Sequence, residues 1–214
     1  MRRLFSIIVI YIASALNSQA AEFFVLPGTN TLLMMGETEA ADVLTLINHI
    51  RIDEIDSLIL KGPGGDLEAG YSLAGVVLEK GLNVMVPKGT KCASACSLIF
   101  SAGKKRSLED GAMLGFHLPF VQLDKKGAAT DYCSQFKNDK PSQSEILFNI
   151  PGIVSGSTCL EKTYQMGLKD IRKLQRYLDR DGISPDVIDL MIDTPSSKMH
   201  WINVEEAAEL GLTN

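Results

Sequence analysis

The sequence has no basic stripe and no surplus of positive charge. Its 21 lysine and arginine residues are outnumbered by 26 aspartates and glutamates, which gives a formal net charge of −5 at pH 7. Affinity for nucleic acid comes largely from basic side chains that neutralise phosphates. The charge balance therefore argues against a nucleic-acid-binding protein, and equally against a peripheral site for anionic lipid.

Metal-binding spacings are also missing. The chain has only four cysteines and three histidines, and they form neither a Cys-x-x-Cys pair nor another Cys/His ligand spacing. Structural zinc sites need four such ligands at short, characteristic intervals. We therefore expect no metal site, and we predict no cofactor.

Only one long apolar run is found, and it lies at the N-terminus. Arg2 and Arg3 precede an apolar stretch over residues 4–16, and Ser18-Gln19-Ala20 supplies the small residues that signal peptidase reads at −3 and −1. The run is shorter than the roughly 20 residues that a membrane span needs. We predict that residues 1–20 are a signal peptide cut after Ala20, so that the mature protein is soluble and periplasmic or secreted. An uncleaved anchor is the alternative.

Residues 21–214 have the length of a single domain with a substantial core. Removal of the two arginines with the leader lowers the formal net charge from −5 to −7. No internal repeat or low-complexity tract divides this part of the sequence. We therefore predict one domain over residues 21–214.

Export makes disulfides the expected state of an even number of cysteines. Those of this chain are Cys92, Cys96, Cys133 and Cys159, and they allow three pairings between which the sequence does not choose rigorously. We favour Cys133–Cys159, because both lie in one long polar excursion of the chain. Cys92 and Cys96 would then pair with each other or stay reduced.

Short apolar runs alternate with stripes of apolar residues at helical spacing. Strands are expected over residues 23–26, 31–35, 57–60, 82–86 and 112–116, and helices over 38–50, 66–80, 95–102, 160–178, 185–192 and after the capping box of 203–206. Thr38 and Asp66 are plausible N-caps, and Gly81 and Gly211 plausible stops. Repeated strand–helix units make a largely parallel sheet with right-handed crossovers, so the predicted fold class is α/β.

Between residues 122 and 159 this alternation gives way to polar, Gly/Ser-rich sequence. A structureless segment of that length is uncommon inside a compact domain. It contains Cys133 and ends at Cys159. We predict a disulfide-containing insertion or a lid over the functional site.

Three segments contain residues suited to one mechanism. Gly64-Gly65 follows a predicted strand where a helix begins, so its backbone N–H groups are open to a carbonyl oxygen. Ser94 lies between two alanines at another strand-to-helix turn, and His117 ends the next strand. Taken singly, such glycines usually form a turn, such a serine is usually an N-cap, and such a histidine is more often a loop or core residue than a base. Neighbouring parallel strands bring their carboxyl ends to one edge of a sheet, so a serine nucleophile and a histidine base could meet there.

These segments match a known family. GPGGDLEAG, KCASACSLIFSAG and GFHLP resemble the oxyanion loop, nucleophile turn and base segment of the proteolytic subunit of Clp protease (ClpP) and its relatives in the crotonase superfamily. The spacings from Gly65 to Ser94, and from Ser94 to Ala102-Gly103, agree with the family pattern without a gap. The closing segment WINVEEAAELGLTN is similar as well, with Asn203 in place of a serine. The resemblance covers residues 55–119 well and 182–214 fairly well.

The resemblance implies stacked ββα units in a spiral, commonly assembled into rings or trimers, with oxyanion donors at the backbone N–H groups of Gly65 and Ala95. It also implies an acidic third member of the triad, but Met199 stands at the matching position. Asp193 could serve if its loop bends back, or one of the serines at 196–197 could orient the imidazole more weakly. Loss of the orienting carboxylate would lower the rate heavily without removing the nucleophile.

The expected function is that of an exported serine peptidase or hydrolase that acts on short peptides, unfolded chains or esters. Export separates it from ATP, so we expect no ATPase partner, while a homo-oligomer is compatible with the resemblance. One alternative is a base supplied by Lys88, Lys91 or Lys104. Another is a catalytically inactive peptide-binding protein on the same fold. Crotonase-like acyl-thioester chemistry would lack coenzyme A outside the cytoplasm.

The cysteines on either side of Ser94 suggest one further role. A Cys92–Cys96 disulfide would stiffen the nucleophile turn, and a redox change could then switch it. Buried small residues are the simpler interpretation. His49 and His200 have no assigned role and are expected on the surface.

Overall fold

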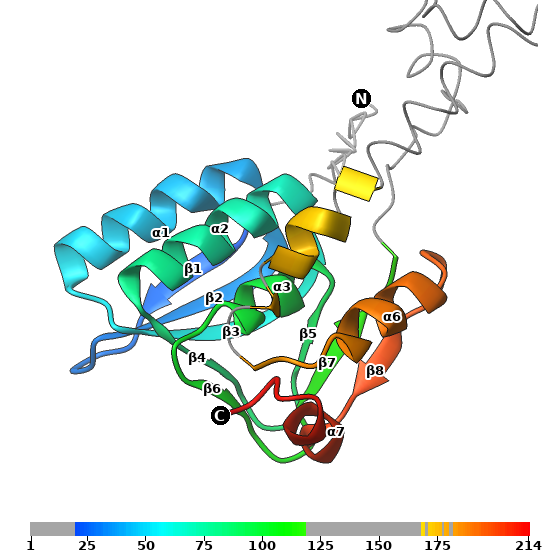
Figure 1. Cartoon of the computed structure of the whole chain (residues 1–214). Helices are drawn as coiled ribbons and strands as arrows, with labels where there is room; N and C mark the ends of the chain where they lie inside the picture. Colours follow the sequence, from blue (N-terminus) through cyan, green and yellow to red (C-terminus); the bar gives the residue numbers. More distant parts are fainter. Residues whose placement is uncertain (1–19, 119–167, 170, 177, 180–181) are drawn as a thin grey trace, which may run out of the picture.

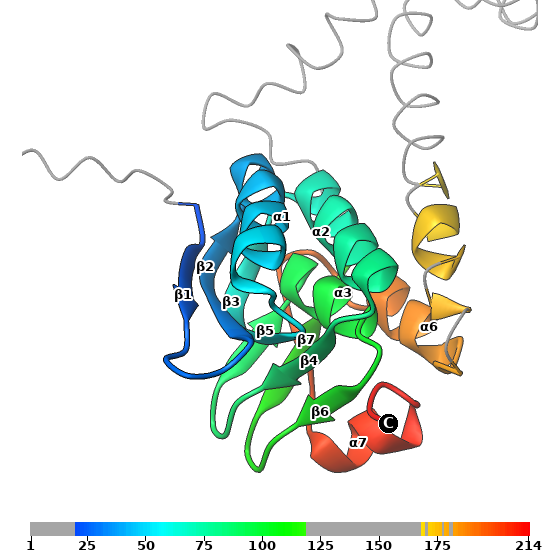
Figure 2. The same ribbon diagram turned by 90° about the vertical axis from the view of Figure 1, so that its left-hand side faces the viewer.

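The computed structural model describes residues 20–118, 168–169, 171–176, 178–179 and 182–214. These residues form a mixed α/β fold with one eight-stranded sheet, which confirms the predicted class. Helices α1 (Ala40–Asp53) and α2 (Leu67–Lys80) lie side by side, and α3 (Ala95–Ser101) packs between α2 and the strands (Figures 1 and 2). Within these ranges no helix is both long and apolar enough to cross a membrane.

The sheet branches at β3 (Ser57–Gly65). The first residues of this strand pair with β4 (Asn83–Val86), which in turn pairs with β6 (Arg106–Leu108). Further along β3, Gly62 pairs with Cys92 of β5 (Lys91–Ala93). All of these pairings are parallel. The branch lets the second half of β3 run on toward β5, so that its end is available to the candidate site.

The remaining strands complete the two ends of the path. Strand β2 (Thr31–Thr38) runs parallel to β3, and β7 (Met113–Phe116) runs parallel to β5. The outer strands β1 (Glu22–Val25) and β8 (His200–Ile202) pair antiparallel with β2 and β7. The prediction of a largely parallel sheet is therefore confirmed.

Three of the predicted helix boundaries are confirmed by their capping contacts. The Asp66 carboxylate accepts a hydrogen bond from the Ala69 N–H at 2.7 Å, and Gly81 ends α2 in the left-handed region at φ 63°. Asn203 forms the predicted capping box of α7 (Val204–Glu209). Thr38 is not a cap, because it is the last residue of β2, and Glu39 caps α1 instead.

The C-terminal residues are fastened to β6 by a buried arginine. The Arg106 guanidinium donates to the backbone oxygens of Gly103 and Leu212, each at 3.0 Å. Its backbone N–H donates to the Asn214 side chain at 2.7 Å. Helix α6 (Asp186–Asp193) buries Val187, Ile188 and Met191 in the same core. Both ends of the described chain therefore belong to a single core.

Some predicted features lie outside the described residues. These are the signal peptide up to residue 19, the insertion over 122–159, and the Cys133–Cys159 pair within it. The predicted helix over 160–178 is described only toward its end, where residues 171–176 are helical.

Candidate active site

The three predicted segments follow three neighbouring strands that run in the same direction. Gly64-Gly65 ends β3, Ser94 follows β5, and His117 follows β7. Ala93 is in register with Gly115, and the Ser94 N–H donates to the Gly115 oxygen at 2.8 Å. The sheet therefore brings the predicted nucleophile, base and oxyanion segments to one edge.

The backbone of Ser94 has an uncommon conformation. Its φ is 55° and its ψ is −123°, and Glu54 is the only other non-glycine residue with positive φ in the described part of the chain. Such a conformation costs on the order of 1–3 kcal/mol and is concentrated at functional sites. Ser94 also occupies the N-cap position of α3 without forming a side-chain cap. The Ser94 hydroxyl therefore does not have the usual structural role of a serine at a helix start, which is to cap the helix.

Gly64 lies directly against this turn. At its φ of 93°, a methyl group on its Cα would lie 2.6 Å from the Ala93 oxygen, 2.7 Å from the Ser94 Cβ and 2.9 Å from the Ala95 nitrogen. These distances are shorter than real carbon contacts, so only glycine fits here. The close approach places the Gly64-Gly65 end of β3, which is the predicted oxyanion loop, beside the Ser94 side chain and the Ala95 amide.

The second glycine of this loop is held from the other side. A methyl group on Gly65, which has φ 148°, would overlap the backbone of Thr38. The Asp66 N–H donates to the Thr38 oxygen at 2.8 Å. The end of β2 therefore fixes the loop from which the predicted oxyanion donor comes. The other predicted donor, the Ala95 N–H, is in the first turn of α3, where amides lack an acceptor within the helix.

His117 is buried, with 8% of its surface exposed. Its Nδ1 lies 2.8 Å from the Leu118 oxygen. A carbonyl can only accept, so Nδ1 carries the proton, and the lone pair of the neutral ring is at Nε2. The Leu118 N–H donates in turn to the Thr194 oxygen at 2.8 Å. The imidazole is thus oriented by backbone in the tautomer that a general base needs.

The structure does not bring Asp193 to the imidazole. Asp193 is exposed at the end of α6, and no hydrogen bond joins it to His117. Met199, at the position that the resemblance assigns to the acid, packs on β7. A methyl group on Gly115 would lie 2.8 Å from its sulfur. The serines at 196–197 are exposed. Among the described residues, the Leu118 carbonyl is the partner found at Nδ1.

Cys92 and Cys96 form a disulfide across the nucleophile turn. Their Cα atoms are 5.2 Å apart, and both residues are buried. Of the two states left open by the sequence, paired or reduced, the structure has the paired one. The bond ties the middle of β5 to the first turn of α3, with Ser94 between them.

Ser97 has a structural role that the sequence did not indicate. Its buried hydroxyl lies 2.8 Å from the Cys92 oxygen and 3.0 Å from the Gly115 oxygen, and it accepts from the Gly115 N–H at 3.3 Å. It thereby joins α3 to β5 and β7. A serine in an apolar helix gives no sequence signal for such a role.

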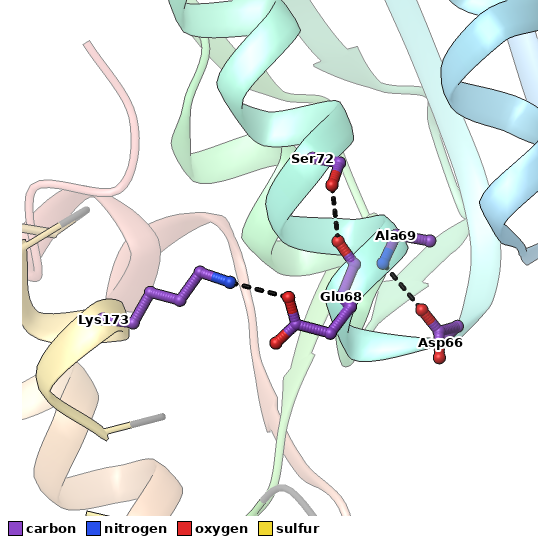
Figure 3. Close-up of polar contacts among 5 residues, drawn as sticks. All are labelled: Asp66, Glu68, Ala69, Ser72 and Lys173. Atoms are coloured by element: carbon purple, nitrogen blue, oxygen red, sulfur yellow. Dashed lines mark hydrogen bonds and ion pairs between the residues drawn. The ribbon is translucent and has the colours of Figure 1, made fainter. Parts of the chain in front are cut away.

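A lysine fastens the helical segment 171–176 to the start of α2. Lys173 forms a 2.8 Å ion pair with Glu68 (Figure 3). Its ammonium also lies 4.1 Å from the ring centre of Tyr71. Asp66, which caps α2, directly follows the Gly64-Gly65 loop. The contact therefore positions the segment next to the predicted oxyanion loop.

Three other candidate residues have partners outside this arrangement. Lys91 is stacked on Trp201 at 4.4 Å, and Lys88 lies 4.0 Å from Asp110. His49 pairs with Asp53 at 2.7 Å on α1. In the described ranges no three histidine, cysteine or acidic side chains are grouped as metal ligands would be.

Comparison with models of known protein families finds no match for the chain, and no curated protein matches it either.

Proposed function

We propose that the protein is an exported serine hydrolase of the ClpP/crotonase type that cleaves peptides, with Ser94 as nucleophile and His117 as general base. The observation that carries the proposal is the backbone of Ser94. A serine at positive φ between a strand and a helix presents its hydroxyl at the edge of a sheet, as nucleophile turns of α/β hydrolases do. Gly64 packs against it and a buried histidine follows the next strand.

In the proposed reaction, the Ser94 Oγ attacks the substrate carbonyl carbon while the His117 Nε2 takes the hydroxyl proton. The backbone N–H groups of Gly65 and Ala95 donate to the oxyanion of the tetrahedral intermediate. The imidazolium then gives its proton to the leaving amine, and the C–N bond breaks. Water then attacks the acyl-enzyme while the His117 Nε2 takes its proton, and that proton passes to the Ser94 Oγ as the acid product leaves.

The weakest part of the proposed machinery is the group behind the base. The Leu118 carbonyl fixes the tautomer of His117, but a neutral oxygen stabilises the imidazolium less than a carboxylate would. Asp193 would have to move its exposed side chain to take this place. We therefore propose an enzyme with a Ser–His pair and backbone orientation, slower than one with a complete triad.

The proposed substrates are short peptides or unfolded segments outside the cytoplasm. This part rests on the predicted signal peptide, because export separates the enzyme from ATP-driven unfolding partners. Assembly into a homo-oligomer and the spiral of ββα units belong to the same proposal. The predicted insertion over 122–159 would then act as a lid or docking element.

The test is labelling with a fluorophosphonate, which reacts only with an activated serine. We expect the mature, oxidised protein to be labelled, Ser94→Ala to give no labelling, and His117→Ala to slow it by at least about 100-fold. Ser72→Ala, on an exposed face of α2, and His49→Gln, at a partly buried position of α1, are controls on other elements and should label like the wild type. Wild-type rates in Ser94→Ala would overturn the assignment.

A second candidate is a catalytically inactive peptide-binding protein on the same fold. It is favoured by Met199 at the position of the acid and by the exposure of Asp193. Fluorescence anisotropy with a library of labelled peptides separates the two. Binding by a folded wild type that the fluorophosphonate does not label would support this candidate over the enzyme.

A further inference from the structure

Asp42 is a buried carboxylate for which the described part of the chain supplies no cationic partner. Only 1% of its surface is exposed, at the first turn of α1. Its Oδ2 accepts two backbone hydrogen bonds, from the Glu39 N–H at 2.7 Å and from the Ala21 N–H at 3.4 Å. Burial raises the pKa of Asp42, the two N–H donors oppose that shift, and the nearby negative charge of Glu39 adds to it. An ionised carboxylate in this place would be stabilised by a positive charge.

The donor at 3.4 Å belongs to the residue that follows the predicted cleavage site. Ala21 has 9% of its surface exposed, and its Cα lies 3.4 Å from where a methyl group on Gly36 would be. Ala21 therefore packs against β2, and its backbone N–H points toward the Asp42 carboxylate. The preceding residue, Ala20, forms an isolated parallel bridge with Glu37.

We propose that Asp42 is a built-in receptor for the mature N-terminus: the α-ammonium of Ala21, released by cleavage after Ala20, binds the Asp42 carboxylate inside the protein. Hydrolysis adds water across the Ala20–Ala21 peptide bond, so that Ala20 leaves as a carboxylate and the Ala21 nitrogen becomes an ammonium group. The amide donor at 3.4 Å is thereby replaced by a charged one. Charge-assisted hydrogen bonds are shorter and roughly twice as strong as neutral ones.

The proposal is specific to one peptide bond. Cleavage one residue later would remove the nitrogen that faces Asp42, and Glu22 is already paired with Met35 in the sheet. Cleavage two residues earlier would leave two residues between the charge and the Ala21 nitrogen, which span about 6.6 Å in an extended chain at 3.3 Å per residue. Cleavage after Ala20 costs the bridge to Glu37 and gains an ion pair shielded from water.

The proposed ion pair is connected to the candidate active site through the end of β2, although the proposal does not depend on that site. Asp42 holds the Glu39 N–H, and Thr38 next to it holds the Asp66 N–H. The mature N-terminus would therefore steady the end of β2, against which Gly65 is packed. Stability rather than hydrolysis is the proper readout.

The experiment is a thermodynamic cycle on purified protein. Two chains are compared, one that begins at Ala21 and one that keeps Gln19 and Ala20, each with and without Asp42→Asn. We expect Asp42→Asn to lower the Tm of the Ala21 chain by about 4 °C or more, and to leave the longer chain unchanged or more stable. Asp110→Asn, which removes an equal charge from an exposed loop, should leave both chains unchanged. Equal effects of Asp42→Asn in both chains would overturn the proposal.

A second measurement needs no substitution. The α-amine is acylated with an excess of reagent at pH 8, and the reaction is followed by mass spectrometry. We expect acylation to be at least about tenfold slower in the folded Ala21 chain than in the longer chain, because the ion pair keeps the amine protonated and buried. Equal acylation rates would overturn the proposal. So would a mass of the exported protein that corresponds to a first residue other than Ala21.

Discussion

The Cα of Gly64 packs against the side chain of Ser94 so closely that a methyl group on the glycine would lie 2.7 Å from the Ser94 Cβ. Gly64 belongs to β3 and Ser94 follows β5, 30 positions later in the sequence, and both have positive φ. Each conformation depends on the other, because the glycine leaves the space that the serine turn occupies. The end of β3 and the turn after β5 therefore pack together as one unit.

Gly64→Ala should disrupt this unit. The added methyl group would meet three atoms of the Ser94 turn, two of them backbone, and overpacking of this kind costs about 1–3 kcal/mol beyond the strain of a positive φ. We expect a loss of stability in urea denaturation together with loss of fluorophosphonate labelling. Gly28→Ala is the matched control, because Gly28 also has positive φ (74°) but has open space around it. A Gly64→Ala protein no less stable than Gly28→Ala would contradict the packing argument.

Ser97→Ala should weaken the attachment of α3 to the sheet. Its hydroxyl is buried among Cys92 and Gly115 backbone groups, and removal leaves these groups without that partner. We expect a cost of about 1–3 kcal/mol in the free energy of unfolding. Ser101→Ala, also buried, removes only a bond to the Ser97 oxygen of its own helix, and should cost less. Equal costs for the two substitutions would show that the cross-strand contacts of Ser97 add nothing.

The Cys92–Cys96 bond should contribute to both stability and reactivity. The loop it closes is short, since the cysteines are only four positions apart, and the chain-entropy model gives about 2 kcal/mol for a loop of that size. In a Cys92→Ala/Cys96→Ala protein we expect stability to fall by about this amount and labelling of Ser94 to slow. Reductant should slow labelling of the wild type and leave the double variant unaffected. Unchanged wild-type labelling after verified reduction of the disulfide would exclude a redox role.

Features set by local sequence were predictable in this chain. Asp66, Gly81 and Asn203 mark helix ends because capping depends on a few neighbouring residues. Strands β5, β6 and β8 were not predicted, because three residues are too few to show a twofold period. Their pairing is decided by the sheet into which they fit.

The candidate site shows the same division. That Ser94 and His117 would lie at one edge of a parallel sheet was expected from the order of elements, but the strand directly before Ser94 is β5, which was not predicted. The Leu118 carbonyl at Nδ1 and the positive φ of Ser94 could not be predicted, because both depend on how the chain turns after its strand. The Cys133–Cys159 pair remains a prediction.

The pH dependence of stability should reveal the state of Asp42 in a chain that keeps residues before Ala21. Burial, with a contribution from Glu39, raises the pKa of Asp42 above its ordinary value of 3.8. The folded protein then binds this proton more tightly than the unfolded chain does. The stability that Asp42 contributes is therefore fully present below pH 3.8 and is lost as pH rises through the raised folded pKa.

Asp42→Asn removes this titration, while the amide oxygen can still accept from the Glu39 N–H. We expect the variant, relative to the unsubstituted chain of the same length, to gain stability as pH rises from about 3.5 to 7 in urea denaturation. Asp110→Asn should show no such trend, because its side chain is exposed. In the chain that begins at Ala21 the trend should reverse, since an ammonium beside Asp42 favours the ionised carboxylate and makes its loss most costly at neutral pH. If the difference in free energy of unfolding between Asp42→Asn and the unsubstituted protein does not depend on pH in either chain, the pKa of this carboxyl is the same in the folded and unfolded states.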